Sequence, residues 1–153
     1  MGQDGWKENL RSCFAGIRLI EQCKLETLVN FGQFCEFIAE PAFEALAEDL
    51  KEFGLRTKSH KQKDKSIAFE IAFPKSRKAQ FIYIITLPKN SVDIRLTLKV
   101  RGRKTQSNDF EDADSTFMEG VTPGEVLKLK KEDLLMDVIE RYKDFMYRSL
   151  TTP

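Results

Sequence analysis

The first third of the chain places its apolar residues at helical spacing. Between Trp6 and Phe31 they recur every three or four positions, which predicts one long or broken helix. Gly16 weakens that helix locally, because glycine has a low helix propensity. The apolar positions of this stretch are Leu10, Phe14, Ile17, Ile20, Leu25, Leu28 and Val29.

A second stretch, from Gln33 to Phe53, repeats this spacing and predicts a second helix, which Gly54 ends. Pro41 lies inside the stretch and cannot donate a backbone hydrogen bond. The helix therefore either kinks or restarts there. We favour a restart, with Glu40 just outside the new helix and Pro41 in its first turn.

After Gly54 the apolar period changes to two, which indicates strands. Ile67 to Phe73 and Val92 to Val100 alternate between apolar and polar residues, as half-buried strands do. Phe81 to Leu87 is apolar on both faces, which is typical of a strand covered on both sides or of one whose outer face meets a partner. With Leu55 to Ser59 as an optional first strand, the pattern predicts an antiparallel meander of three to four strands.

The last third begins with an aperiodic acidic stretch. Residues 105–125 contain six acids and no period, so they are interpreted as a surface loop. At its end, Thr122 to Glu125 has the spacing of a helix capping box, although Glu125 to Leu129 fits a short strand equally well. From Lys131 the apolar residues lie on one helical face, with acids early and bases late, which predicts a C-terminal helix.

These elements define an α+β fold in one domain of 153 residues. The expected order is N-terminal helices at about 6–53, the sheet at about 55–101, an acidic loop at about 105–125 and a helix at about 131–149, with the helices packed on one face of the meander. The start lacks the basic and apolar regions of an export signal, and no apolar run approaches the ~18 residues of a membrane span. We therefore expect a cytoplasmic protein without a membrane partner.

Charge is strongly segregated along the chain, although the net charge is only +1. Residues 75–104 hold nine bases and one acid, and residues 105–125 hold six acids and no base. Alternate turns of a meander lie at the same end of the sheet, so the bases fall into two groups. The first group contains the anion-binding candidates Lys75, Arg77, Lys78, Arg101, Arg103 and Lys104. The second contains His60, Lys61, Lys63, Lys65 and Lys89.

Either basic group would suit a phosphate or an acidic partner. Two alternatives need no external anion. The acids from Asp109 to Asp114 would neutralise the first group if they folded back on it, and lysines at hairpin ends also discourage edge-to-edge strand pairing.

The sequence contains no recognised catalytic motif. His60 is the only histidine, and the cysteines Cys13, Cys23 and Cys35 lack metal-binding spacing and are expected to be reduced core thiols. There is no glycine-rich phosphate loop or nucleophile elbow. We therefore expect no enzyme activity, no metal and no cofactor; a divalent ion held weakly by the acidic loop is the one enzymatic alternative.

A non-catalytic module that binds another macromolecule is the favoured interpretation, with a protein as the expected partner. A homodimer is one form of it, because the apolar helix faces exceed what one small sheet obviously covers. Tyr83 and Phe110 are the candidate solvent-facing aromatics for partner binding. The alternative is an anion or nucleic-acid binder that uses the basic hairpin ends, although the isoelectric point of about 7.7 is low for that class.

Overall fold

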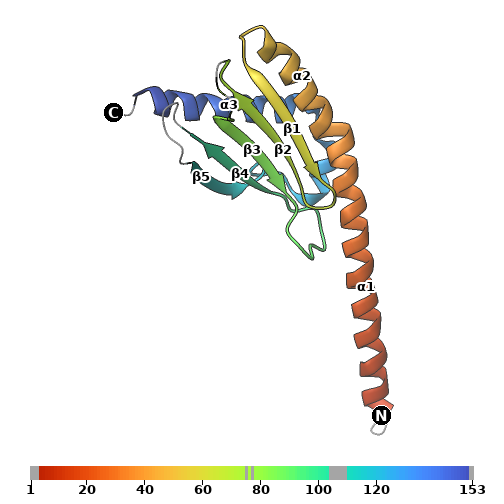
Figure 1. The fold of residues 1–153 in the computed structure, drawn as a ribbon. Helices are drawn as coiled ribbons and strands as arrows, with labels where there is room; N and C mark the ends of the chain where they lie inside the picture. Colours follow the sequence, from red (N-terminus) through yellow and green to blue (C-terminus); the bar gives the residue numbers. More distant parts are fainter. Residues whose placement is uncertain (1–3, 75, 77, 104–109, 152–153) are drawn as a thin grey trace.

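The computed structural model describes residues 4–74, 76, 78–103 and 110–151, and it confirms the α+β architecture (Figure 1). A long N-terminal helical segment leads into a five-stranded antiparallel sheet in the order β1-β2-β3-β4-β5, and a C-terminal helix packs on the sheet. The helical elements are α1 (Gly5–Phe34), η2 (Cys35–Ala39), α2 (Glu40–Lys51), η3 (Pro123–Lys128) and α3 (Lys131–Thr151). The strands are β1 (Arg56–Gln62), β2 (Ser66–Ala72), β3 (Phe81–Thr86), β4 (Thr97–Gly102) and β5 (Glu111–Thr116).

The N-terminal helices are joined without a loop. Pro41 lies in the first turn of α2, as expected, but Glu40 is inside that helix and not just outside it, and the backbone remains right-handed helical from α1 into α2. A π-helical turn, η2, ends at Ala39, two residues before Pro41. Proline removes one backbone donor, and the wider turn changes the hydrogen-bond register at that point. The predicted interruption is therefore a π-helical turn and not a break.

Two strand predictions need correction. β4 begins at Thr97 and not at Val92, although Ile94 and Leu96 before it are buried. The predicted acidic loop contains an edge strand, β5, which pairs antiparallel with β4 and is exposed at every position. Alternation of apolar and polar residues arises only where one face is buried, so a fully exposed strand carries no such signal.

The core lies between one face of the sheet and the helices. Odd-numbered residues of β2 and β3 point into it, and α2 and α3 cover them. The Phe43 ring of α2 stacks on Phe69 of β2 at a centroid distance of 5.0 Å. Phe81 of β3 lies 5.9 Å from Phe145 of α3. The helices therefore lie on one face of the meander, as predicted.

The other face of the sheet is not covered by any helix among the described residues (Figure 1). Ile82 and Ile84 of β3 lie on it and are half-buried. In the strand register Ile82 stands between Glu70 and Arg101. Long charged side chains of neighbouring strands thus shield part of the apolar centre, which explains why β3 is apolar on both faces.

The C-terminal part decides between the two alternatives for Glu125 to Leu129. This segment contributes to the 3-10 helix η3 and not to a strand, and its capping box is formed. The Thr122 hydroxyl lies 2.7 Å from the Glu125 carboxylate. α3 follows as predicted, with acids in its first turn and Arg148 in its last. Among the described residues no helix is both long and apolar enough to cross a bilayer.

Candidate interaction surfaces

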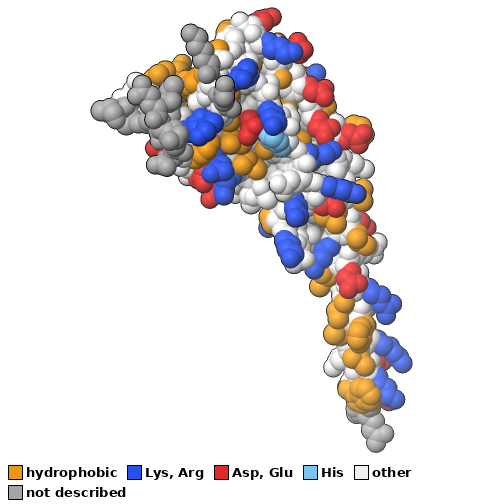
Figure 2. Space-filling model, viewed as in Figure 1, with side chains coloured by type: hydrophobic (Ala, Val, Ile, Leu, Met, Phe, Trp, Pro, Cys, Tyr) orange, Lys and Arg blue, Asp and Glu red, His pale blue; other side chains and the backbone are white. Residues whose placement is uncertain are grey.

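The first half of α1 projects beyond the sheet and the other helices (Figure 1). Every residue from 4 to 22 is exposed, and Thr27 is the first buried residue of the helix. Large apolar side chains are nevertheless present there, with Trp6 61% exposed, Phe14 51% and Ile17 43%. Figure 2 shows hydrophobic side chains along this projecting end. We define the apolar stripe as Trp6, Leu10, Cys13, Phe14, Ile17 and Ile20.

The apolar stripe continues the helix face that the chain itself buries. Leu10 and Ile17 are followed at intervals of seven by Lys24 and the buried Phe31. Trp6, Cys13 and Ile20 are followed at the same interval by the buried residues Thr27 and Phe34. Apolar residues at two positions of each heptad, alternately three and four residues apart, form the seam along which a helix packs against another element. The projecting half thus presents a packing face that no other described part of the chain covers.

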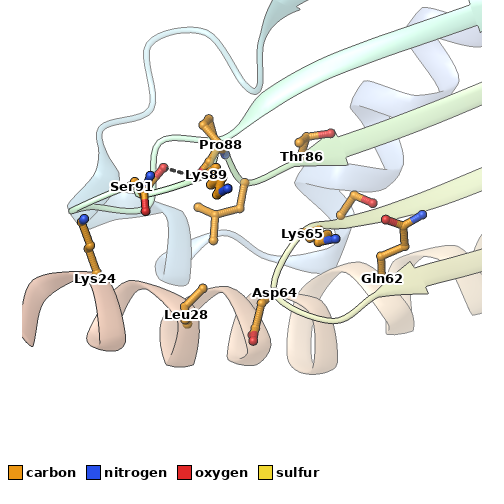
Figure 3. Close-up of a pocket in the computed structure, with 12 residues that line it drawn as sticks. Lys24, Leu28, Gln62, Asp64, Lys65, Thr86, Pro88, Lys89 and Ser91 are labelled. Atoms are coloured by element: carbon orange, nitrogen blue, oxygen red, sulfur yellow. Dashed lines mark hydrogen bonds between the residues drawn. The ribbon is translucent and has the colours of Figure 1, made fainter. Parts of the chain in front are cut away.

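A cleft of about 670 Å³ opens where α1 reaches the sheet. Lys24 and Leu28 point from α1 toward the connection between β3 and β4, which carries Lys89 and Ser91 (Figure 3). Asp64 points toward α1 from the turn between β1 and β2. A second cleft of about 690 Å³ shares Leu28 and Asp64 with the first and is also lined by Lys63. Both clefts are open and border the base of the projecting helix.

Among the described members of the first basic group, Arg101 is engaged in an ion pair within the chain. The Arg101 guanidinium lies 2.9 Å from the carboxylate of Asp112 on β5. Lys99 lies 3.9 Å from Asp114. The alternative in which the acids neutralise the bases is therefore confirmed for Arg101, through strand pairing of β5 with β4.

Arg103, another candidate of that group, is only 5% exposed. Its guanidinium lies 5.5 Å from the Phe110 ring, and Arg101 lies 4.7 Å from the same ring. The backbone N–H of Arg103 donates to the carbonyl of Gln80, so the β2–β3 connection and the end of β4 do meet, as the meander predicts. Lys78 is exposed on that connection. Lys75, Arg77 and Lys104 lie outside the described residues.

Tyr83 is fully buried, so the expectation that it faces solvent is wrong. Its hydroxyl donates a hydrogen bond to Asp137 of α3. Burial, followed by the negative charge of Asp137, raises the pKa of Tyr83 well above its ordinary value. Phe110, the other predicted aromatic, is half-buried beneath the two arginines. Neither ring offers an open stacking platform.

The second basic group is divided between ion pairs and the clefts. Lys61 lies 2.8 Å from Glu40 of α2, and this hydrogen-bonded carboxylate raises the pKa of the Lys61 ammonium. His60 lies 2.9 Å from Glu70. Lys65 and Lys89 line the first cleft. His60 and Lys61 are thus paired within the chain, whereas Lys63, Lys65 and Lys89 border the two clefts.

The chemistry available to the described residues is limited. No three metal-ligating side chains gather among them. Cys35 is buried, and burial raises its pKa to about 12, so its thiolate is scarce at neutral pH. Cys13 is exposed on the projecting helix, contrary to the expectation that all three cysteines lie in the core.

Comparison of the chain with models of protein families, with curated proteins and with solved structures finds no match. The assignment of a role therefore depends on the surfaces described above. The sequence does not by itself predict that the first helix projects. The sequence nevertheless contains a signal for the projection. The heptad repeat runs from Trp6 to Phe34, and a helix of that length extends beyond the strands of the sheet.

Proposed function

We propose that this chain is a protein-interaction module that docks through the apolar stripe of its projecting helix. The observation that carries the proposal is the exposure of the stripe over residues 6–20, while the same helix face is buried from Thr27 onward. Contiguous apolar patches on soluble proteins commonly mark interaction sites. Helices that lack tertiary contacts are also only marginally stable in water at this length. A partner on the stripe would bury the apolar side chains and would also supply the tertiary contacts that stabilise the helix.

The charges around the stripe favour a protein over a membrane surface or a nucleic acid. Residues 4–26 hold four acids and four bases. Helices that lie on membranes typically carry a basic polar face, and nucleic-acid surfaces need an excess of cations. A balanced set of charges beside an apolar seam is typical of helices that pack on other helices. The balanced charges are Asp4, Glu8, Glu21 and Glu26 against Lys7, Arg11, Arg18 and Lys24.

The test compares two matched variants. Leu10→Glu with Ile17→Glu puts two charges on the stripe, seven residues apart. Ala15→Glu with Gln22→Glu puts the same charges at the same spacing on the opposite side of the helix. None of the four side chains contributes to the core, so both variants are expected to fold like the wild type.

The three proteins are immobilised and mixed with native cell extract, with and without nuclease, at low and moderate salt. We expect a stoichiometric protein, either a second copy of this chain or another protein, on the wild type and on the control variant. The stripe variant should lose it. Equal capture by all three proteins, or recovery of nucleic acid alone, would contradict the proposal.

Anion or nucleic-acid binding through the basic hairpin ends is the weaker alternative. Arg101 is already paired with Asp112, and Arg103 is buried. An anion would have to displace Asp112 from Arg101. Binding of that kind weakens steeply as salt is added, whereas an apolar contact does not. The salt series above therefore distinguishes the two functions.

A further inference from the structure

We infer that the partner on the stripe is a second copy of this chain, whose projecting helix runs antiparallel to the first. This inference rests on the proposed function and adds the partner and the register of pairing. Three observations support it. The seam face of α1 is exposed only toward the N-terminal end of the helix, apolar residues would meet along an antiparallel seam, and the charges that flank this seam are complementary.

A parallel pair of helices is blocked by the chain itself. The seam face of α1 is buried from Thr27 through Phe34 against the chain's own core. A second helix that ran parallel along the seam would enter that core after Lys24. An antiparallel helix does not continue past this point, because α1 begins at Gly5. The two sheets would then lie at opposite ends of the helix pair.

The antiparallel register places apolar residues together. When Leu10 faces Ile20 of the second copy, Cys13 faces Ile17 of the second copy, and both pairs recur by symmetry. Trp6 then faces Lys24 of the second copy at each end of the seam. An ammonium over an indole ring is a favourable contact, and it suits the place where the seam meets solvent. No charged side chain is left within the apolar part of the seam.

The residues that flank the seam have complementary charges only in this orientation. Lys7 and Glu21 lie seven residues on either side of Phe14, along the same edge of the seam. In an antiparallel pair these edges face each other, so Lys7 of one copy meets Glu21 of the second, twice in the dimer. Such flanking pairs determine partner choice and orientation in helix pairs. In a parallel pair Glu21 would meet Gly16 of the second copy, and no ion pair would form.

The cleft at the base of the helix provides space for the end of the second helix. Lys24 and Leu28 of α1 line it, between the apolar stripe and the buried part of the helix (Figure 3). Trp6 of the second copy would enter beside Lys24. The connection that carries Lys89 and Ser91 would then border the N-terminus of the second copy.

The experiment uses charge reversal in the full chain. Lys7→Glu places a carboxylate against Glu21 of the second copy, and Glu21→Lys places an ammonium against Lys7 of the second copy. Each variant alone converts two attractive contacts into two repulsive ones, so we expect dimer dissociation constants to rise by about tenfold. When the two variants are mixed, every contact is attractive again, and the mixed dimer should recover the wild-type affinity.

The measurement is sedimentation equilibrium over a wide concentration range at low salt. Glu8→Lys and Arg11→Glu serve as controls, because they reverse charges on the side of the helix that faces away from the seam. They should dimerise like the wild type. Lys7 also lies 3.8 Å from Asp4 in its own chain, but this contact is exposed and contributes little. Circular dichroism of each variant verifies that the fold is retained.

Three results would overturn the inference. A wild type that stays monomeric at every concentration excludes the second copy, while the proposed function survives if the stripe variant still loses another protein from the extract. A wild-type dimer without recovery in the mixed variants excludes this register. A monomer that sediments with vesicles of phosphatidylcholine and phosphatidylglycerol, through the stripe, excludes both the dimer and the proposed function.

Discussion

The hydroxyl of Tyr83, in the middle of β3, donates a hydrogen bond to the Asp137 carboxylate on α3. Asp137 also lies 3.8 Å from Arg141, so its charge is partly compensated within the helix. The Tyr83 contact joins the central strand to the C-terminal helix across the core. A polar link at this depth orients α3 on the sheet, because a partly buried carboxylate that lacks a donor is costly.

Replacement of Tyr83 by Phe should therefore destabilise the protein. The ring keeps its packing against Phe43, but Asp137 loses its buried donor, and we expect a loss of about 1–2 kcal/mol in the free energy of unfolding. Urea unfolding measures it. Tyr142→Phe is the matched control, because the Tyr142 ring also packs on a core aromatic, Phe81, but the residue is only half-buried. Equal effects of the two substitutions would contradict the role assigned to Asp137.

A second prediction concerns Gly102 at the end of β4. A methyl group at this residue would clash with the Phe145 ring, because the ring fills the space that the missing side chain leaves. Gly102→Ala should cost about 1–3 kcal/mol, because overpacking a core forces neighbours off their preferred rotamers. Gly124→Ala, with open space around it, should change stability by less than about 0.5 kcal/mol.

A double-mutant cycle isolates the steric cause. In a Phe145→Ala background the ring is absent, so Gly102→Ala should lose most of its cost. An unchanged cost in that background would mean that the backbone of β4, and not the ring, requires glycine.

The sequence predicts most of the fold because burial leaves periodic marks. α2, β2 and α3 each have one buried face, and their apolar periods are clear. β5 has no buried face, and among the described residues it is held by its pairing with β4 and by the contacts of Asp112 with Arg101 and of Asp114 with Lys99. The sequence of such an edge strand therefore predicts a loop. The residues that hold β5 belong to β4, so the apolar spacing of β5 itself does not indicate a strand.

The site residues illustrate a different limit. β3 is apolar on both faces, so its sequence does not show whether Tyr83 or Ile84 points into the core. The helices cover the odd-numbered face, and Tyr83 is buried as a result. The heptad positions of α1 likewise run from Trp6 to Phe34, although other described residues cover only the second half of the helix. A pattern of apolar residues shows that a face packs, but not what it packs against.

Alkaline pH should destabilise the protein through Cys35. Burial raises the pKa of Cys35 from its ordinary 9.0 to about 12 in the native state. Above pH 9 the unfolded chain releases this proton while the native chain retains it, so stability is full below pH 9 and falls as pH rises toward 12. Tyr83 and Tyr142, whose pKa values burial also raises, act in the same direction above pH 10.

Urea unfolding at about pH 8 and about pH 10 measures this effect. Between these values the wild type should lose about 1 kcal/mol more than Cys35→Ala, which has no thiol to titrate at this position. The substitution also leaves a small cavity, so the comparison uses the change with pH and not the absolute stability. Parallel curves for the two proteins would disprove the assignment. A thiol reagent applied in dilute solution, where the proposed dimer is dissociated, supplies a control, because exposed Cys13 should react long before buried Cys35.

Gly16 tests how far the projecting helix depends on a partner. It lies in the middle of the apolar stripe's length, and a methyl group there would meet nothing within 4 Å. Gly16→Ala should stabilise the helix by about 1 kcal/mol through propensity alone. Ala15→Gly, on the neighbouring residue, should weaken the helix by a similar amount and serves as the reverse control.

Hydrogen exchange of the amides over residues 6–20 measures both variants at two protein concentrations. In dilute solution the helix end lacks its partner, so local unfolding governs exchange, and Gly16→Ala should slow it while Ala15→Gly accelerates it. At high concentration the proposed second copy should cover the stripe, and exchange should then require dissociation of the dimer. All three proteins should become more protected as concentration rises. Protection that does not depend on concentration would show that the helix end is stable by itself. The helix would then need no partner for its stability.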